Sequence, residues 1–216
     1  MATVTEAQVL TLAQWFSPAF PVGAFHFSGG LEWAIEDGRV GDVTGLRSWI
    51  EDVIRGGAGK SDATFLAAAR AADEAGLEEL DATARAFAPS AERLFETVET
   101  GRAFGIAVAA VHGITMPGLT YPIAVGRAAC LMEMPAELTA QMYLQAMVAN
   151  LAAVGMRLIP VGQTEGQRII AGLLPLCREV AEATAAGDVD SLGTCAFMAD
   201  IASMRHETQY SRIFRT

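Results

Sequence analysis

Apolar residues recur along the chain at the three- and four-residue spacing of an amphipathic helix. The clearest stripe, in residues 42–56, consists of Val43, Leu46, Trp49, Ile50, Val53 and Ile54. A second, in residues 163–186, consists of Ile169, Leu173, Leu176, Cys177 and Val180, and Pro175 is expected to kink that helix. A third, in residues 5–16, consists of Val9, Leu12, Ala13 and Phe16. Side chains at this spacing share one helix face, so each stripe predicts a helix that buries that face.

Residues suited to helix starts mark where further helices begin in the rest of the chain. Ser28, Asp42 and Ser90 are suited to cap the helices that follow them, because their short side chains accept hydrogen bonds from free backbone N–H groups. Further helices are predicted near residues 31–37, 62–75, 77–87, 90–112, 122–133, 136–157 and 190–205. Because no repeat or linker interrupts this series, we predict a single all-α domain over residues 1–216. It is a bundle of about eight to ten helices with a flexible C-terminal tail at about 206–216.

The composition favours helix and limits the classes of partner. Forty residues are Ala, the residue with the highest helix propensity. The net charge is −10, so neither nucleic acid nor a membrane surface is expected as a partner. Residues 1–100 carry 16 acids and 7 bases, whereas residues 101–216 carry 9 and 8, which suggests two docking faces of different charge. Three widely spaced cysteines suit a reducing cytoplasm.

Short motifs of known chemistry are incomplete in this chain. Gly59-Lys60-Ser61 resembles part of a phosphate-binding loop, but Ile54 stands where the first glycine is required, and we interpret residues 56–59 as a helix-ending turn. His206-Glu207 resembles the start of a zinc-protease motif, but Tyr210 replaces its second histidine. We interpret the acidic run as a solvated face; it comprises Asp73, Glu74, Glu78, Glu79 and Asp81. The sequence therefore predicts no catalytic residue, cofactor or metal site.

Two polar segments remain as candidate binding surfaces. Arg157, Gln163 and Gln167 surround a Pro/Gly turn, where they either join helix ends by hydrogen bonds or form a surface for another protein. The final residues include Arg205, His206, Tyr210 and Arg212. Arginine and aromatic side chains are common at interface hot spots, whereas chain termini are commonly disordered. A tail that becomes ordered when it binds a partner reconciles the two interpretations.

Four blocks together resemble the UreF family of urease accessory proteins. They are SPAFPVGAF at 17–25, SGGLEWA at 28–34, RLIPVGQTEGQ at 157–167 and MRHETQYSRIFR at 204–215. The blocks stand in family order, so the resemblance covers the whole chain. Gly29 and His26 depart from the residues common in the family, which leaves partner specificity at the second block open.

The resemblance implies a cytoplasmic, non-enzymatic adaptor that forms a homodimer. Such a protein binds UreD (also called UreH), recruits the GTPase UreG and docks on apo-urease, and it couples GTP hydrolysis to nickel delivery. Carried over by motif, UreD contacts fall on Arg205, His206, Tyr210 and Arg212. UreG contacts fall near Glu32, taken as an exposed charge, with Arg157, Gln163 and Gln167 near the dimer or complex surface.

Two other functions remain as alternatives. A nickel-binding metallochaperone would use His26, His112, His206 or the cysteines. A GTPase would use Gly59-Lys60-Ser61, and we expect no GTP turnover by this chain.

Overall fold

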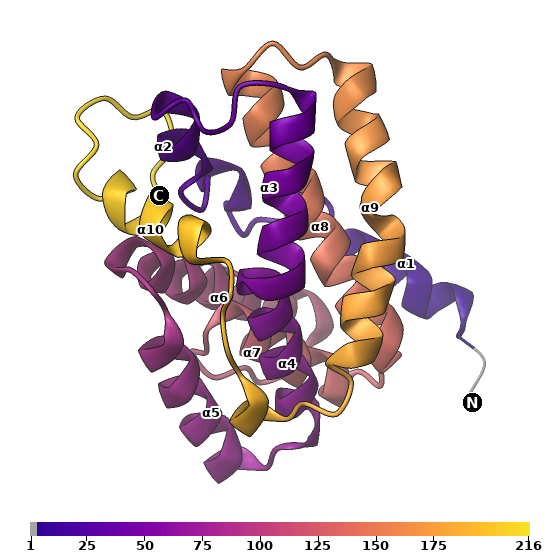
Figure 1. Ribbon diagram of the computed structural model, residues 1–216. Coiled ribbons are helices and arrows are strands. Elements are labelled where there is room, and N and C mark those ends of the chain that lie inside the picture. The colour runs from indigo at the N-terminus through magenta and orange to yellow at the C-terminus, as the bar shows by residue number, and fades with distance from the viewer. Residues whose placement is uncertain (1–3) are drawn as a thin grey trace.

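The computed structural model describes residues 4–216, which form ten α-helices, two short 3-10 helices and no strand (Figure 1). The α-helices are α1 (Glu6–Trp15), α2 (Leu31–Glu36), α3 (Val43–Gly56), α4 (Ala58–Ala71), α5 (Glu74–Phe87), α6 (Ala91–His112), α7 (Tyr121–Leu131), α8 (Ala136–Leu158), α9 (Gln163–Ala183) and α10 (Phe197–His206). The 3-10 helices are η1 (Ala24–His26) and η2 (Val189–Ser191). The all-α prediction is confirmed.

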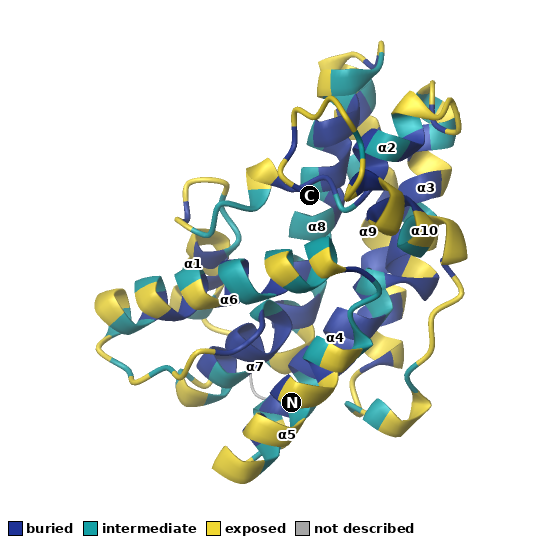
Figure 2. Ribbon diagram, turned by 90° about the vertical axis from the view of Figure 1, so that its left-hand side faces the viewer, coloured by how far each residue is buried: buried dark blue, intermediate teal, exposed yellow. Residues whose placement is uncertain are grey.

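The core of the bundle is built around α4 and α8. Helix α4 packs against α3, α7 and α8, and α8 packs in turn against α9. Figure 2 shows buried positions concentrated on the facing sides of these helices. Gly126 of α7 lies so close to the Leu66 carbonyl of α4 that a Cβ atom would overlap it, which explains glycine inside this helix. Gly126 therefore lets α7 approach α4 closely.

The two strongest helix stripes are buried as expected. In α3, Leu46, Trp49, Ile50, Val53 and Ile54 are buried, and Val43 packs at the edge of the core. In α9, all five predicted residues are buried. Asp42 and Ser90 cap α3 and α6, because their side chains accept from the N–H groups of Gly45 and Arg93. The expected kink at Pro175 stays a prediction.

The predicted face of the first helix is only partly correct. Leu12 is buried and Phe16 packs against the core as predicted, but Val9 is 42% exposed, and Trp15, which was not predicted, is buried. Trp15 lies edge-on to Phe104 of α6 at a centroid distance of 5.4 Å, and its indole N–H donates to His112 at 3.2 Å. The aromatic contact with α6 thus buries the face of α1 that carries Leu12 and Trp15. The apolar spacing within the helix does not determine which face is buried.

Two further expectations are corrected by tertiary contacts. Asp81 was assigned to the solvated acidic face, but it is buried, and its carboxylate accepts from the Thr120 N–H at 2.6 Å and pairs with Arg85. The last helix begins at Phe197 rather than near residue 190, because η2 and an extended segment come first.

Helix α10 and the residues after it lie on one side of the bundle, beside α2 and α6 (Figure 1). The C-terminal residues therefore lie beside the second sequence block, residues 28–34, although the two segments are far apart in the chain. None of the helices described in residues 4–216 combines the length and apolar character that crossing a membrane requires.

Candidate functional site

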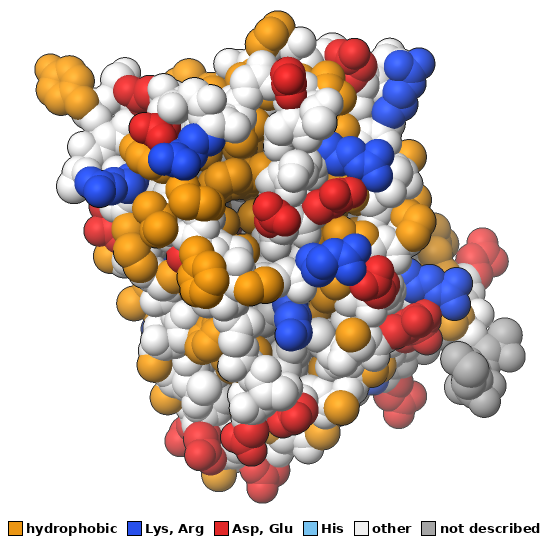
Figure 3. Space-filling model, in the orientation of Figure 1, with side chains coloured by type: hydrophobic (Ala, Val, Ile, Leu, Met, Phe, Trp, Pro, Cys, Tyr) orange, Lys and Arg blue, Asp and Glu red, His pale blue; other side chains and the backbone are white. Residues whose placement is uncertain are grey.

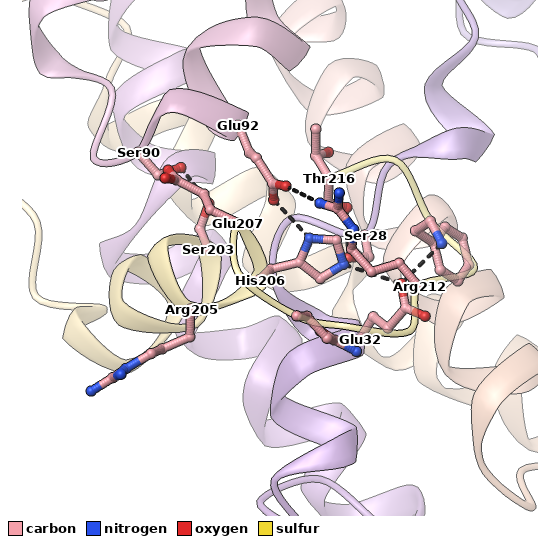
Figure 4. A network of polar contacts seen from close by, with 12 residues as sticks. Ser28, Glu32, Ser90, Glu92, Ser203, Arg205, His206, Glu207, Arg212 and Thr216 are labelled. Atoms are coloured by element: carbon pink, nitrogen blue, oxygen red, sulfur yellow. Dashed lines mark hydrogen bonds and ion pairs between the residues drawn. The ribbon is translucent and has the colours of Figure 1, made fainter.

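Glu32 of α2 is the centre of a buried polar network that holds the C-terminal segment (Figure 4). Its carboxylate accepts from the backbone N–H groups of Ile213 at 2.7 Å and Phe214 at 2.9 Å. It also contacts the Nε2 atom of His206 at 3.1 Å. Glu32 is only 5% exposed, so the prediction of an exposed charge is wrong. The folded tail covers it, and the two backbone N–H donors together with the His206 contact offset the cost of burying the carboxylate.

His206 joins two carboxylates from different helices. Its Nδ1 atom lies 2.7 Å from Glu92 of α6, and its Nε2 atom faces Glu32 on the opposite side. The ring is fully buried, and Arg212 donates to the second oxygen of Glu92 at 2.7 Å. His206, Arg212 and two carboxylates therefore connect α2, α6, α10 and the tail.

The last three residues complete the attachment of the tail. Phe214 is buried, and the Arg157 guanidinium lies 4.6 Å from the centre of its ring. The Arg215 guanidinium lies 4.5 Å from the ring centre of Phe95. Cationic groups at these distances from aromatic rings are attracted to the negative faces of the rings. Arg157, on α8, thus stabilises the tail. The position of Arg157 before the Pro/Gly turn in the sequence did not indicate this role.

Ser28 binds the end of the tail rather than capping α2. Its N–H and hydroxyl donate to the Thr216 carbonyl oxygen at 2.6 and 2.7 Å. The residue at the N-cap position of α2 is instead Gly30, which has a φ of +83°. A Cβ atom on Gly30 would lie 2.5 Å from the backbone nitrogen of Ser203, so α10 packs directly on this turn. The glycine serves both the left-handed turn and the close approach of α10.

An apolar and basic surface lies outside this network. On α10, the exposed apolar side chains are Phe197, Met198, Ile201 and Met204, and Figure 3 shows such side chains gathered over this helix. Arg205 points away from the buried network in Figure 4 and is exposed. Tyr210 is fully exposed and Ile213 is 67% exposed. The predicted tail residues thus separate into an inward pair, the buried His206 and the exposed Arg212 that pairs with Glu92, and an outward pair, Arg205 and Tyr210.

Gln163 and Gln167 lie elsewhere. Both are exposed in the first turns of α9, and no hydrogen bond or ion pair within residues 4–216 joins them to the tail. The Glu165 carboxylate accepts from the Gly162 N–H at 3.1 Å, so the hydrogen bond described at this helix start involves Glu165 rather than either glutamine.

The incomplete motifs occupy structural positions. Gly59-Lys60-Ser61 forms part of the first turns of α4, which starts at Ala58, directly after the break at Gly57 that ends α3. His112 accepts the hydrogen bond from Trp15, and His26 is exposed beside Phe25. In the described part of the chain, no three His, Cys, Asp or Glu side chains are grouped so that they could hold a metal ion.

Comparisons with known proteins agree with the four sequence blocks. The family model for UreF matches residues 40–174. A urease accessory protein UreF of Ruegeria pomeroyi is 51% identical over the full length of both chains. The chain belongs to the UreF family of urease accessory proteins.

Other UreF proteins resemble the chain over nearly its full length. That of Roseobacter denitrificans is 49% identical and aligns with 96% of this chain and 93% of its own. That of Rhodopseudomonas palustris is 42% identical and aligns with 97% and 94%. The tail network lies outside the matched residues 40–174 except for Glu92, Phe95 and Arg157, but these full-length relatives include that part of the chain.

Sequence reasoning missed the residues of the UreF fold that receive the tail. Glu92 and Phe95 lie on α6, where they belong to no motif. Ser28 is predicted from the sequence to cap the helix that follows it, not to bind the tail. Glu92 follows the N-cap Ser90 by two residues, a position where an acid is favourable for local reasons alone. No sequence signal distinguishes that local role from a contact with the tail.

Proposed function

We propose that this chain is a non-enzymatic adaptor in the nickel-dependent maturation of urease. In this proposal it acts in the cytoplasm as a homodimer, binds UreD, recruits UreG and docks on apo-urease. It couples GTP hydrolysis by UreG to nickel delivery. The observation that carries the proposal is similarity over the full chain to proteins named urease accessory protein UreF.

The docked tail suggests which residues meet UreD. Arg205 and Tyr210 project outward next to the exposed apolar side chains of α10. A surface with arginine and aromatic anchors beside apolar area has the chemistry of a protein interface. His206 and Glu32 contribute indirectly, because they hold the tail in the position that exposes this surface. We therefore assign UreD binding to the outward residues and a positioning role to the inward ones.

Capture of UreD and UreG from the same source by the purified full-length chain tests this assignment. The variant Arg205→Ala/Tyr210→Ala should lose UreD capture by tenfold or more and keep the thermal unfolding midpoint of the parent, because both side chains are exposed. Arg168→Ala, at an exposed arginine on α9, is the matched control and should capture UreD normally. Undiminished capture by the double variant would contradict the assignment to the tail.

The remaining contacts and the rival function need separate measurements. Gln163→Ala/Gln167→Ala should weaken assembly of the dimer or of the UreG complex, measured by light scattering after size-exclusion chromatography, and leave UreD capture unchanged.

Equilibrium dialysis against nickel distinguishes the adaptor from a metallochaperone. An adaptor binds nickel weakly and below one ion per chain, whereas tight stoichiometric binding would favour a nickel carrier. A GTPase assay of the pure chain should show no turnover.

A further inference from the structure

A cavity of about 120 Å³ lies between α4, the α5–α6 connection, α6, α8 and α10. Its wall is mainly apolar and includes the rings of Phe27, Phe65 and Phe87. The exposed Thr194 and the half-buried Asp200 also line it, so the cavity reaches the surface beside α10. A dry apolar cavity of roughly 150 Å³ is known to take benzene, so this one suits a ligand with a small apolar body.

One side of the cavity is charged. Arg93 Nη2 donates to Asp62 Oδ2 at 2.6 Å, and Arg93 Nη1 pairs with Glu96 Oε1 at 3.3 Å. The Tyr143 hydroxyl also donates to Asp62 Oδ2, at 2.7 Å. Both described bonds to Asp62 end on Oδ2, which leaves Oδ1 for a further donor. Glu96 Oε2 is enclosed by protein and has no hydrogen-bond partner in residues 4–216. Two carboxylates therefore share one guanidinium.

The balance of charge in the cavity is negative. Asp62, Glu96 and Asp200 line it together with a single cation, Arg93. Burial raises the pKa of Glu96, and the Asp62 charge adds to this rise, while Arg93 opposes it. Burial also raises the pKa of Asp200. An additional positive charge in the cavity would stabilise both carboxylates in their ionised forms.

The apolar wall decides which kind of cation fits. Hard metal ions need several oxygen ligands or retained water, which phenylalanine rings do not supply. An organic cation has an apolar stem that gains from leaving water, and its charged head is also attracted to ring faces. A concave apolar pocket with a few convergent polar groups is the usual form of a small-molecule site.

We propose that this cavity binds a small organic cation, a primary ammonium or amidinium group carried on a short apolar stem. The head lies against Asp62 and Glu96, and the stem lies among the phenylalanine rings. The site is independent of the urease role proposed above, because none of the outward tail residues lines the cavity.

Benzylamine is a suitable probe, and its binding to the full-length chain at pH 7 can be measured by calorimetry. We expect saturable binding of benzylamine and at least tenfold weaker binding of benzyl alcohol, which has the same ring but no charge. Glu96→Gln should weaken benzylamine binding about tenfold, and the control Glu99→Gln, on the same helix but outside the cavity lining, should not.

A variant that fills the cavity gives a second test. Ala84 is buried in the lining, and Ala84→Leu should abolish benzylamine binding in a protein whose circular dichroism is unchanged. No saturable binding of benzylamine by the parent would overturn the proposal. Equal affinity for benzyl alcohol, or full binding by Glu96→Gln, would overturn its cationic part.

Discussion

The Glu32 carboxylate and the His206 imidazole meet at 3.1 Å in the interior, although 174 positions separate them in the chain. The contact joins the second sequence block to the last one, and both blocks carry the resemblance to UreF. The two motifs are therefore halves of one structure, in which the first block receives the tail that the last block supplies.

Glu32→Gln should release the tail and lower the free energy of unfolding by about 3 kcal/mol, because the buried N–H groups of Ile213 and Phe214 and the His206 ring lose the carboxylate that they share. Urea unfolding measures the loss, and hydrogen exchange at the Ile213 and Phe214 amides reports the release. Glu78→Gln, at an exposed glutamate on α5, should stay within about 0.5 kcal/mol of the parent. In Glu32→Gln/His206→Gln the two losses should not add, because both variants break the same contact. Additive losses would show that the two residues act separately.

Gly30→Ala and Gly29→Ala form a matched pair of adjacent left-handed glycines. A Cβ atom on Gly30 would lie 2.5 Å from the Ser203 backbone nitrogen, whereas a Cβ atom on Gly29 would have no heavy atom within 4 Å. Gly29→Ala should cost only the backbone strain, about 1–2 kcal/mol. Gly30→Ala should cost clearly more, because α10 must also move. Thermal unfolding of the two variants provides the comparison, and equal losses would contradict direct packing of α10 on this turn.

Cys177 should react more slowly with thiol reagents than Cys195. Burial raises the pKa of Cys177 to about 11, so at pH 8 few of its thiols are ionised, and the side chain is also hidden in the core. Cys195 is exposed. Labelling with iodoacetamide followed by peptide mass spectrometry should therefore find Cys195 modified first, and urea should remove the difference. Early modification of Cys177 in the folded protein would contradict its placement.

The raised pKa of Glu96 implies a specific dependence of stability on pH. Burial favours the neutral acid in the folded state, so its stabilising contribution is complete below the unfolded pKa of about 4.3 and is lost as pH rises through the higher folded pKa. The unfolding free energy of the parent minus that of Glu96→Gln should therefore fall between pH 4 and pH 7. Urea titrations of both proteins across this range provide the measurement. A constant difference would mean that Glu96 titrates alike in both states.

Local patterns predicted much of the helical framework. The stripes of α3 and α9 and the caps Asp42 and Ser90 follow from spacing within a few residues, and all are found in the structure. From patterns of the same kind, the face of α1 was predicted only in part and the role of Ser28 wrongly. In these cases a distant partner decided the outcome, Phe104 for α1 and Thr216 for Ser28.

The sequence by itself determined the all-α class, the main helices and, through its four blocks, the family. Helix periodicity and capping are short-range effects, and each is complete within one segment. Only the tertiary structure decided that Glu32 and His206 face inward while Arg205 and Tyr210 face outward. A charged residue is buried only where enough donors or opposite charges converge on it, and the fold brought those groups from distant segments.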